Sequence, residues 1–445
     1  MTMTNPALDL TPERWRSRVA EVLTRARDRS QLLTDAVDDD DLVHQHSPLM
    51  SPLVWDLAHV GNQEELWLVR DVGGRAPVRQ DIDDLYDAFK HPRANRPSLP
   101  LLGPAEARHY VREVREKVLD VLDHSPLQGR PLLEQAFAFG MVTQHEQQHD
   151  ETMLATHQLR RGAAVLDVNP PPKATRLREA EVLVPGGQFT MGTSTEPWAL
   201  DNERPAHEVD VGPFFIDTAA VTNGAFMAFI DAGGYEQPWW WSAPGWGHRK
   251  ASGLSAPQFW EREAGIWWRL RFGVRERVPA DEPVMHVSFH EAQAYAAWAG
   301  KRLPTETEWE KAPRWDPATG RSRRYPWGDQ DPGPEHANLG QRHLRPAEAG
   351  AYPRGASPLG VHQLIGDVWE WTSSNFGGYP GFTAFPYPEY SLVFFGFDYK
   401  VLRGGSFGSD AVAVRGTFRN WDYPIRRQIF AGFRCARDPR PGEVR

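Results

Sequence analysis

Apolar residues recur at helical spacing through the first third of the chain, and this pattern predicts helices over residues 11–160. Each helix carries one apolar face, so we expect a four-helix bundle. The connection at about residues 71–103 is long for a small bundle, and connections of that length are usually functional. The start signals lie at Thr11-Pro12, Ser51-Pro52, about Pro104 and about Leu132.

The pattern changes after residue 165. Residues 166–180 contain the stiff run Asn169-Pro170-Pro171-Pro172-Lys173 and are expected to form a linker. Residues 181–440 are rich in Gly, Pro and Trp, and Val182–Gly192 is typical of a strand, a turn and a second strand. Helical patches are expected near 223–232 and 290–300. The chain is therefore predicted to be α+β, with a helical domain at 1–165, the linker, and a loop-rich domain at 181–440.

Charge and cysteine content narrow the possible functions. The net charge is −9 and no long basic stretch occurs, so nucleic acid is not an expected partner. Cys435 is the one cysteine, which excludes a disulfide within the chain and a cysteine-based zinc site. The N-terminal residues show no signal-peptide pattern, and no run of about 18 apolar residues suggests a membrane span. We expect a cytoplasmic protein without a membrane partner.

A candidate metal site stands in the fourth predicted helix, in the string His145-Glu146-Gln147-Gln148-His149. Residues four apart share a helix face, so both imidazoles can reach one ion. His59 lies on the second helix of the same bundle. Three neutral imidazoles with open positions suit Fe(II), and less specifically zinc or copper. The alternative is that the paired histidines are solvated, or are hydrogen-bonded within the core without a metal.

The same string also matches the H-E-x-x-H motif of zinc peptidases, in which Glu146 would be the general base. The extended form of that motif continues with a glycine and a third histidine. This chain has Thr152 and Ala155 at those two places. The peptidase interpretation is therefore weaker, although the motif alone leaves it open.

A series of motifs in the second half of the chain is more specific than any one string. They are Val184-Pro185-Gly186-Gly187, Met191-Gly192, Asn202-Glu203-Arg204-Pro205-Ala206-His207, Val221-Thr222-Asn223, Arg302-Leu303-Pro304-Thr305-Glu306, Glu308-Trp309-Glu310, Tyr325-Pro326-Trp327-Gly328, Gly366-Asp367-Val368-Trp369-Glu370-Trp371, Arg403-Gly404-Gly405-Ser406 and Ala431-Gly432-Phe433-Arg434. This block resembles the formylglycine-generating-enzyme/sulfatase-modifying domain, which has a C-type-lectin-like fold. A DinB-like bundle followed by this domain resembles the ergothioneine-pathway sulfoxide synthases of actinobacterial type.

The resemblance implies a reaction and a metal. Members of the family hold Fe(II) with three histidines, which match His59, His145 and His149. They use dioxygen to couple hercynine, a histidine betaine, to the sulfur of γ-glutamylcysteine and give the sulfoxide. The family's catalytic tyrosine matches Tyr379 in Gly378-Tyr379-Pro380-Gly381-Phe382, where it would act as a proton donor. Without the family, a tyrosine in such a loop would be interpreted as a surface aromatic.

Substrate contacts follow from the same resemblance and fit the chemistry of the substrates. Arg93 and Arg96 match the family's thiol-substrate arginines, and guanidinium groups bind carboxylates in a bidentate manner. Asp422 could pair with the ammonium group of γ-glutamylcysteine. The family's hercynine contacts match Gln148, Asn420 and Trp421.

Several alternatives are weighed against this interpretation. A copper formylglycine-generating enzyme needs a cysteine pair, and only Cys435 is present. An ovothiol-type synthase usually carries a further methyltransferase domain, for which we see no sequence after about residue 440. Free cysteine as the thiol donor stays open, as does a structural calcium ion. A non-catalytic lectin-like binding module is the alternative from a different class, and it would not need a bundle with three histidines.

Overall fold

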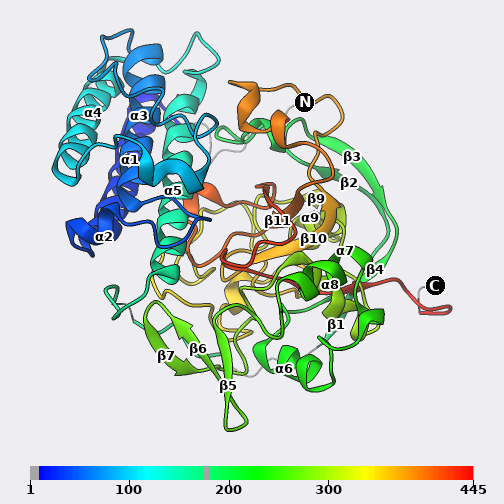
Figure 1. The fold of residues 1–445 in the computed structure, drawn as a ribbon. Helices are drawn as coiled ribbons and strands as arrows, with labels where there is room; N and C mark the ends of the chain where they lie inside the picture. The colour runs from blue at the N-terminus through cyan, green and yellow to red at the C-terminus, as the bar shows by residue number, and fades with distance from the viewer. Residues whose placement is uncertain (1–9, 168, 175–179, 444–445) are drawn as a thin grey trace. The chain divides into compact units, whose positions relative to one another are not determined.

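The structure is a computed structural model that describes residues 10–167, 169–174 and 180–443 (Figure 1). The chain forms two compact units. The first contains the described residues up to Asp167, together with Thr195–Trp198 and Phe272–Val274, and the second contains the remainder. Part of the predicted linker, residues 168 and 175–179, lies outside the described residues.

The first unit is a helical bundle. Helix α3 packs against α4 and α5, and α1 packs against α5 (Figure 1). The prediction of a DinB-like helical domain is confirmed in fold class. Its elements are α1 Pro12–Asp35, α2 Asp39–Val43, α3 Leu53–Glu64, the π-helical η1 Glu65–Val72, the 3₁₀ turn η2 Arg93–Ser98, α4 Pro104–His124, the 3₁₀ turn η3 Glu134–Ala136 and α5 Phe137–Leu159.

Three of the four predicted helix starts are confirmed within a residue or two. The Thr11 side chain accepts a hydrogen bond from the Arg14 amide, with Pro12 at the first helical position. Helix α3 begins at Leu53, but the residue before it is Pro52 and no side chain caps it. Ser51 instead accepts a hydrogen bond from the Arg96 guanidinium at 2.6 Å. The Ser51 hydroxyl therefore bonds to Arg96 of the long connection and does not cap the helix.

The fourth helix starts later than predicted, at Phe137 rather than about Leu132. Gln135 and Ala136 have φ values of 51° and 57°, in the left-handed region that ends a right-handed helix. From Phe137 onward, α5 is buried on nearly every face. Its apolar periodicity is weak because buried polar side chains interrupt it, and these polar groups need partners inside the bundle.

Helix α3 approaches α4 closely at Gly61. A Cβ atom built on this glycine would lie 2.7 Å from Val111 Cγ1 and 3.2 Å from Tyr110 Cε1, so a larger residue would push the two helices apart. His59 lies two residues earlier on α3, and its position depends on this close packing.

The second unit has short strands and short helices joined by long loops. The strands are β1 Glu181–Val184, β2 Gly187–Met191, β3 His207–Val211, β4 Phe214–Asp217, β5 Trp260–Glu263, β6 Ile266–Arg271, β7 Val274–Arg277, β8 Trp315–Asp316, β9 Arg321–Ser322, β10 Trp369–Asn375, β11 Lys400–Arg403, β12 Asn420–Asp422, β13 Ala431–Gly432 and β14 Ala436–Arg437. The helices are α6 Asn223–Asp231, α7 Ala243–Ala251, α8 Phe289–Trp298 and α9 Glu306–Arg314, with 3₁₀ turns at Asp201–Glu203, Pro238–Trp240, Pro353–Gly355, Pro388–Tyr390, Leu392–Phe394 and Ala411–Ala413.

The sheets pair segments that are distant in sequence. The orders are β12-β11-β10-β13, β1-β4-β14, β5-β6-β7, β2-β3 and β8-β9. Both strands predicted within Val182–Gly192 exist, but they do not pair with each other. Val184 pairs with Phe214, whereas Met191 pairs with His207. The Gly186-Gly187 turn therefore moves the chain from one sheet to another instead of closing a hairpin.

Buried ion pairs and tryptophans occupy much of the interior of the second unit. The Arg434 guanidinium donates to both carboxylate oxygens of Glu370 at 2.7 Å, and the Trp309 indole donates to the same carboxylate at 2.7 Å. All three side chains are buried. Cys435 is buried as well, and burial raises the pKa of its thiol. Among the described helices, none is long and apolar enough to cross a membrane.

Candidate metal centre

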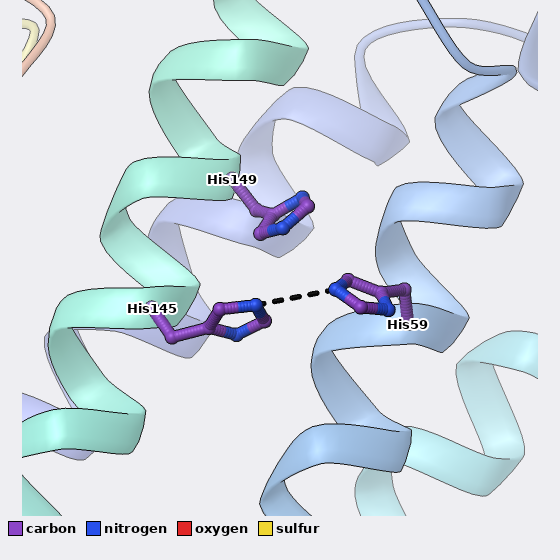
Figure 2. A group of neighbouring side chains, drawn as sticks. All are labelled: His59, His145 and His149. Carbon is purple, nitrogen blue, oxygen red and sulfur yellow. Dashed lines mark hydrogen bonds between the residues drawn. The ribbon is translucent and has the colours of Figure 1, made fainter. Parts of the chain in front are cut away.

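Three histidines converge inside the bundle of the first unit (Figure 2). His59 comes from α3, and His145 and His149 come from successive turns of α5. Each offers one ring nitrogen, and these nitrogens all lie within 4.8 Å of one another. The Nε2 atoms of His59 and His145 are 3.2 Å apart. Two nitrogens that share a first-row metal at bonds of about 2.1 Å lie roughly 3 Å apart, so this spacing fits a common ion.

Hydrogen bonds on the outer nitrogens orient two of the rings. His59 Nδ1 lies 2.7 Å from the backbone oxygen of Tyr86, and His149 Nδ1 lies 2.9 Å from Asp56 Oδ1. A carbonyl or carboxylate oxygen only accepts, so each Nδ1 carries the proton and donates. The Nε2 lone pairs of His59 and His149 are therefore left for a metal, as in many protein metal sites.

Protonation also favours metal binding. Burial and the neighbouring imidazoles of His149 and His145 lower the pKa of His59 well below its usual range. Burial and His149 do the same to His145. Both rings are neutral at pH 7, which is the form that binds metals. The buried Nδ1 of His145 has no hydrogen-bond partner among the described residues. Within the part of the chain that the structure describes, no carboxylate joins this cluster of ligands.

Glu146, the residue next to His145, has both carboxylate oxygens occupied. Arg27 Nε donates to Oε1 at 2.7 Å, and Arg115 Nη2 donates to Oε2 at 2.8 Å. The same two arginines hold Glu64, which closes a buried ring of two cations and two anions. These cations keep the pKa of Glu146 below its usual value despite its burial. A carboxylate held in this way is not available as a peptidase general base.

The long connection is folded against α3 by polar contacts. Arg70 donates to Asp83 at 2.6 Å, and Asn62 donates to the same carboxylate at 2.9 Å. Tyr86 is fully buried, and its hydroxyl accepts a hydrogen bond from the Leu102 amide at 2.9 Å. The carbonyl that orients His59 therefore belongs to a fixed part of the connection.

Arg96 is buried at the end of this connection, although no carboxylate pairs with it. It donates to Ser51 Oγ at 2.6 Å and to the His91 carbonyl at 3.0 Å. Among the described residues, the hydrogen-bond acceptors of Arg96 and of the nearby Arg93 are a hydroxyl and backbone carbonyls, and the Asp56 carboxylate is close enough to Arg96 to raise its pKa without bonding to it. Burial lowers the pKa of Arg96 to about 10. A buried cation of this kind is suited to binding an anion that comes from outside the chain.

Gln148 lies on the same face of α5 as two of the histidines. His145, Gln148 and His149 are partly exposed on a helix that is otherwise mostly buried. Spacings of three and four residues place the three side chains together. The position of Gln148 on α5 is therefore compatible with its predicted contact to hercynine, which stays a prediction.

The remaining predicted residues lie in the second unit. Trp421 is in β12, where its ring stacks on Phe376 at 4.0 Å between centroids. Successive residues of a strand face opposite sides, so Asn420 and Asp422 share the face that Trp421 does not. Asp422 lies 3.4 Å from Arg426 Nε.

Tyr379 is buried in the hydrophobic core of the second unit. Its hydroxyl donates to Glu310 Oε2 at 3.4 Å, and the Arg419 guanidinium lies 4.3 Å from the centre of its ring. Burial raises the pKa of this phenol, so it stays protonated at neutral pH. Arg419 directly precedes Asn420, which links Tyr379 to the start of β12. The predicted site residues thus form two groups, one in each unit.

Some residues around the candidate metal site were not found from the sequence. Trp55 and Asp56 precede His59 by four and three residues, so helical spacing already places them on its side of α3. Arg27 and Arg115 come from other helices, and no local pattern connects them with Glu146. Tyr86 acts through its backbone, which no side-chain motif reveals.

Comparison with known proteins defines the class first. Residues 23–153 match the DinB superfamily, and residues 168–439 match the sulfatase-modifying factor enzyme 1-like domain. The second match extends to a formylglycine-generating enzyme of Streptomyces coelicolor, 36% identical over 60% of this chain and 91% of the relative. The chain therefore belongs to the class of proteins in which a DinB-type helical domain is followed by a sulfatase-modifying-factor domain.

The relatives that match nearly the whole chain include two hercynine oxygenases. A hercynine oxygenase of Mycolicibacterium thermoresistibile is 54% identical over 96% of this chain and 98% of the relative. A hercynine oxygenase of Mycobacterium tuberculosis is 55% identical over 94% of this chain and 97% of the relative. The chain belongs to the hercynine oxygenase family.

Proposed function

We propose that this protein is an Fe(II)- and dioxygen-dependent sulfoxide synthase that joins hercynine to the sulfur of γ-glutamylcysteine. It is an oxidoreductase of the ergothioneine pathway. The observation that carries the proposal is the cluster of His59, His145 and His149 in a full-length member of the hercynine oxygenase family. In the proposed division of labour, residues 1–165 hold the metal, 166–180 link the domains, and 181–440 supply substrate contacts.

The three histidines would hold the iron through their Nε2 atoms. Bound Fe(II) would supply open coordination positions and the redox chemistry that the use of dioxygen requires. Because imidazole binds a metal in its neutral form, the site could accept an anionic thiolate without an excess of negative charge. The Asp56 carboxylate and the Tyr86 carbonyl hold the rings of His149 and His59 in place. Gln148, on the same face of α5, would contact the imidazole of hercynine.

The thiol substrate would be bound by the connection of the first unit. γ-Glutamylcysteine carries two carboxylates, and Arg93 and Arg96 are two nearby cations without carboxylate partners among the described residues. Free cysteine has one carboxylate and would leave one of these arginines without an anion. We therefore prefer γ-glutamylcysteine, and Asp422 would pair with its ammonium group.

The second unit would contribute the remaining groups. Asn420 and Trp421 would contact hercynine, whose quaternary ammonium favours aromatic faces over a single carboxylate. Tyr379 would donate a proton from a phenol that burial keeps protonated. Its contacts with Glu310 and Arg419 would hold the hydroxyl in a fixed orientation.

The zinc-peptidase alternative loses its catalytic base, because Arg27 and Arg115 occupy both oxygens of Glu146. A non-catalytic lectin-like module gives no role to three convergent imidazoles. These two observations favour the oxygenase over both alternatives.

The test is a product assay by mass spectrometry. The protein is loaded with Fe(II) in the absence of oxygen and given hercynine, air and either γ-glutamylcysteine or cysteine. We expect a cross-linked sulfoxide from γ-glutamylcysteine at a much higher rate than from cysteine. Efficient product from cysteine alone would contradict the assignment of the arginines, and no consumption of either thiol would contradict the reaction.

A further inference from the structure

A flat stack of three side chains connects the candidate metal site with the buried arginine. The ring of Trp55 lies parallel to that of His59, with an angle of 13° and 4.6 Å between centroids. The guanidinium carbon of Arg96 lies 3.4 Å from the centre of the Trp55 ring. If both groups lay on the same face of the indole they would collide at these distances. The imidazole and the guanidinium therefore lie on opposite faces, with the indole between them. All three side chains are buried.

Trp55 also touches the groups that orient the ligands. Its ring centroid is 6.1 Å from that of Tyr86, whose carbonyl accepts the His59 proton, and 6.5 Å from that of His149. Its own indole N–H is buried without a hydrogen-bond partner among the described residues. An unpartnered buried donor is unfavourable, and phenylalanine would avoid it. The large aromatic face is the part of this side chain that the surrounding groups use.

The stack also surrounds the charge of Arg96. Burial lowers the pKa of Arg96 to about 10, and the nearby Asp56 carboxylate acts in the opposite direction without a hydrogen bond to the guanidinium. The face of an indole attracts a cation electrostatically, most strongly when water is excluded. Trp55 therefore favours the charged guanidinium before an anion arrives and fixes its distance from His59.

We propose that Trp55 is a positioning residue that sets the spacing between the metal ligand His59 and the carboxylate-binding Arg96. This inference rests on the proposed function. A thiol substrate whose carboxylate binds Arg96 would then hold its sulfur at a fixed distance from the metal. Hercynine has no such contact with Arg96 in the proposed arrangement. Trp55 should therefore control metal affinity and thiol affinity, and should have little effect on hercynine.

The test compares Trp55→Leu with Trp55→Phe in the full-length protein. Metal affinity is measured by anaerobic titration with Fe(II), and the affinities of the loaded protein for γ-glutamylcysteine and hercynine are measured separately by calorimetry. We expect Trp55→Leu to weaken γ-glutamylcysteine binding about 30-fold, which corresponds to one desolvated cation–π contact. Fe(II) binding should weaken about 10-fold, as for loss of other groups that orient ligands. Trp55→Phe, which keeps an aromatic face, should restore most of both affinities.

The matched control is Trp15→Leu. Trp15 is another buried tryptophan of the first unit, and it packs against Trp198. This variant should lose thermal stability and keep both affinities within about twofold, as expected when no ligand contact is removed. If Trp55→Leu behaves like Trp15→Leu, Trp55 is only a core residue and the proposal is wrong.

Misfolding of Trp55→Leu and failure of the proposed substrate can each be distinguished from failure of the role of Trp55. If Trp55→Leu does not fold, a double-mutant cycle of Trp55→Met, which fills much of the space without an aromatic face, with Arg96→Lys replaces it. Non-additive losses of γ-glutamylcysteine affinity would support the stack, and additive losses would contradict it. If the wild-type protein binds Fe(II) but not γ-glutamylcysteine, the proposed thiol substrate and the role of Trp55 both fail. Normal wild-type binding with an unaffected Trp55→Leu contradicts the role of Trp55 alone.

Discussion

Arg96 of the first unit and two buried arginines of the second unit have different partners, although Arg27 and Arg115 of the first unit are paired with carboxylates as well. In the first unit, Arg96 is buried beside the histidine cluster, and its acceptors are a hydroxyl and backbone carbonyls. In the second unit, Arg403 donates to Glu306 at 3.0 Å and to Glu310 at 2.6 Å, and Arg434 holds Glu370 through two bonds. A buried cation that is hydrogen-bonded to an internal carboxylate is already neutralised, whereas one without such a bond can still bind an anionic ligand. Under the proposed function, Arg96 binds the thiol substrate, and the paired arginines of the second unit have a structural role.

The histidine cluster should show the largest effect of any single change. His145→Ala removes one of three imidazole ligands, so Fe(II) affinity should fall by at least about 10³-fold and sulfoxide formation should be lost. His157→Ala is the matched control, since His157 is buried on the same helix and contacts the Leu33 carbonyl. Iron content after anaerobic loading and desalting gives the readout. Equal iron in both variants would show that the cluster is not the metal site.

A change in the buried Arg434–Glu370 pair of the second unit should lower stability rather than metal affinity. Arg434→Leu leaves the buried Glu370 carboxylate without its cation and with only the Trp309 indole as donor, which should lower the free energy of unfolding by about 3–5 kcal/mol. Fe(II) affinity of the folded fraction should not change, because the ligands lie in the other unit. Denaturant unfolding and anaerobic iron titration measure the two quantities. A large loss of iron affinity at a low temperature, where the variant is still folded, would show that the Arg434–Glu370 pair also supports the histidine cluster and would contradict this expectation.

The assignment of Tyr379 makes a prediction about products. Tyr379→Phe removes the hydroxyl, so sulfoxide formation should fall about 10²-fold, the usual contribution of a general acid. The thiol should instead be oxidised to its sulfinic acid, which mass spectrometry distinguishes from the cross-linked product. Tyr387→Phe and Tyr390→Phe are matched controls from the segment that follows Tyr379 in the chain. An unchanged product ratio in Tyr379→Phe, or the same shift in a control, would refute this assignment.

The smallest predicted effect concerns the arginine without a carboxylate partner. Arg96→Lys keeps a cation but loses the planar fork, so the KM for γ-glutamylcysteine should rise about 30-fold while the KM for hercynine stays unchanged. Arg79→Lys is the control, because Arg79 lies on the same connection and already pairs with Asp81 at 2.7 Å. Steady-state kinetics with each substrate varied in turn separate the two constants. An equal rise in both KM values would point to a general disturbance of the bundle.

The sequence predicts the first unit better than the second, for a physical reason. Helical contacts are local, so the spacing of His145 and His149 is enough to place both rings on one face. The start of α3 was predicted as well, although Ser51 serves Arg96 rather than the helix end. The beginning of α5 was missed because the backbone turns left-handed at Gln135 and Ala136.

Contacts between distant segments explain what the sequence does not reveal. Glu146 is held by Arg27 and Arg115 from other helices, so H-E-x-x-H alone does not distinguish a base from a structural anion. In the second unit, Val184 and Met191 belong to neighbouring strands that join different sheets. The placement of Tyr379 against Glu310 likewise depends on packing across the domain.

The most direct test of the central claim is the reaction of the Fe(II)-loaded wild-type protein under isotope-labelled dioxygen. Hercynine and γ-glutamylcysteine are supplied together, and the product is analysed by mass spectrometry. We expect a cross-linked sulfoxide that carries one labelled oxygen atom, with no such product before iron is added. A sulfoxide whose oxygen comes from water, or thiol oxidation without a bond to hercynine, would contradict the central claim.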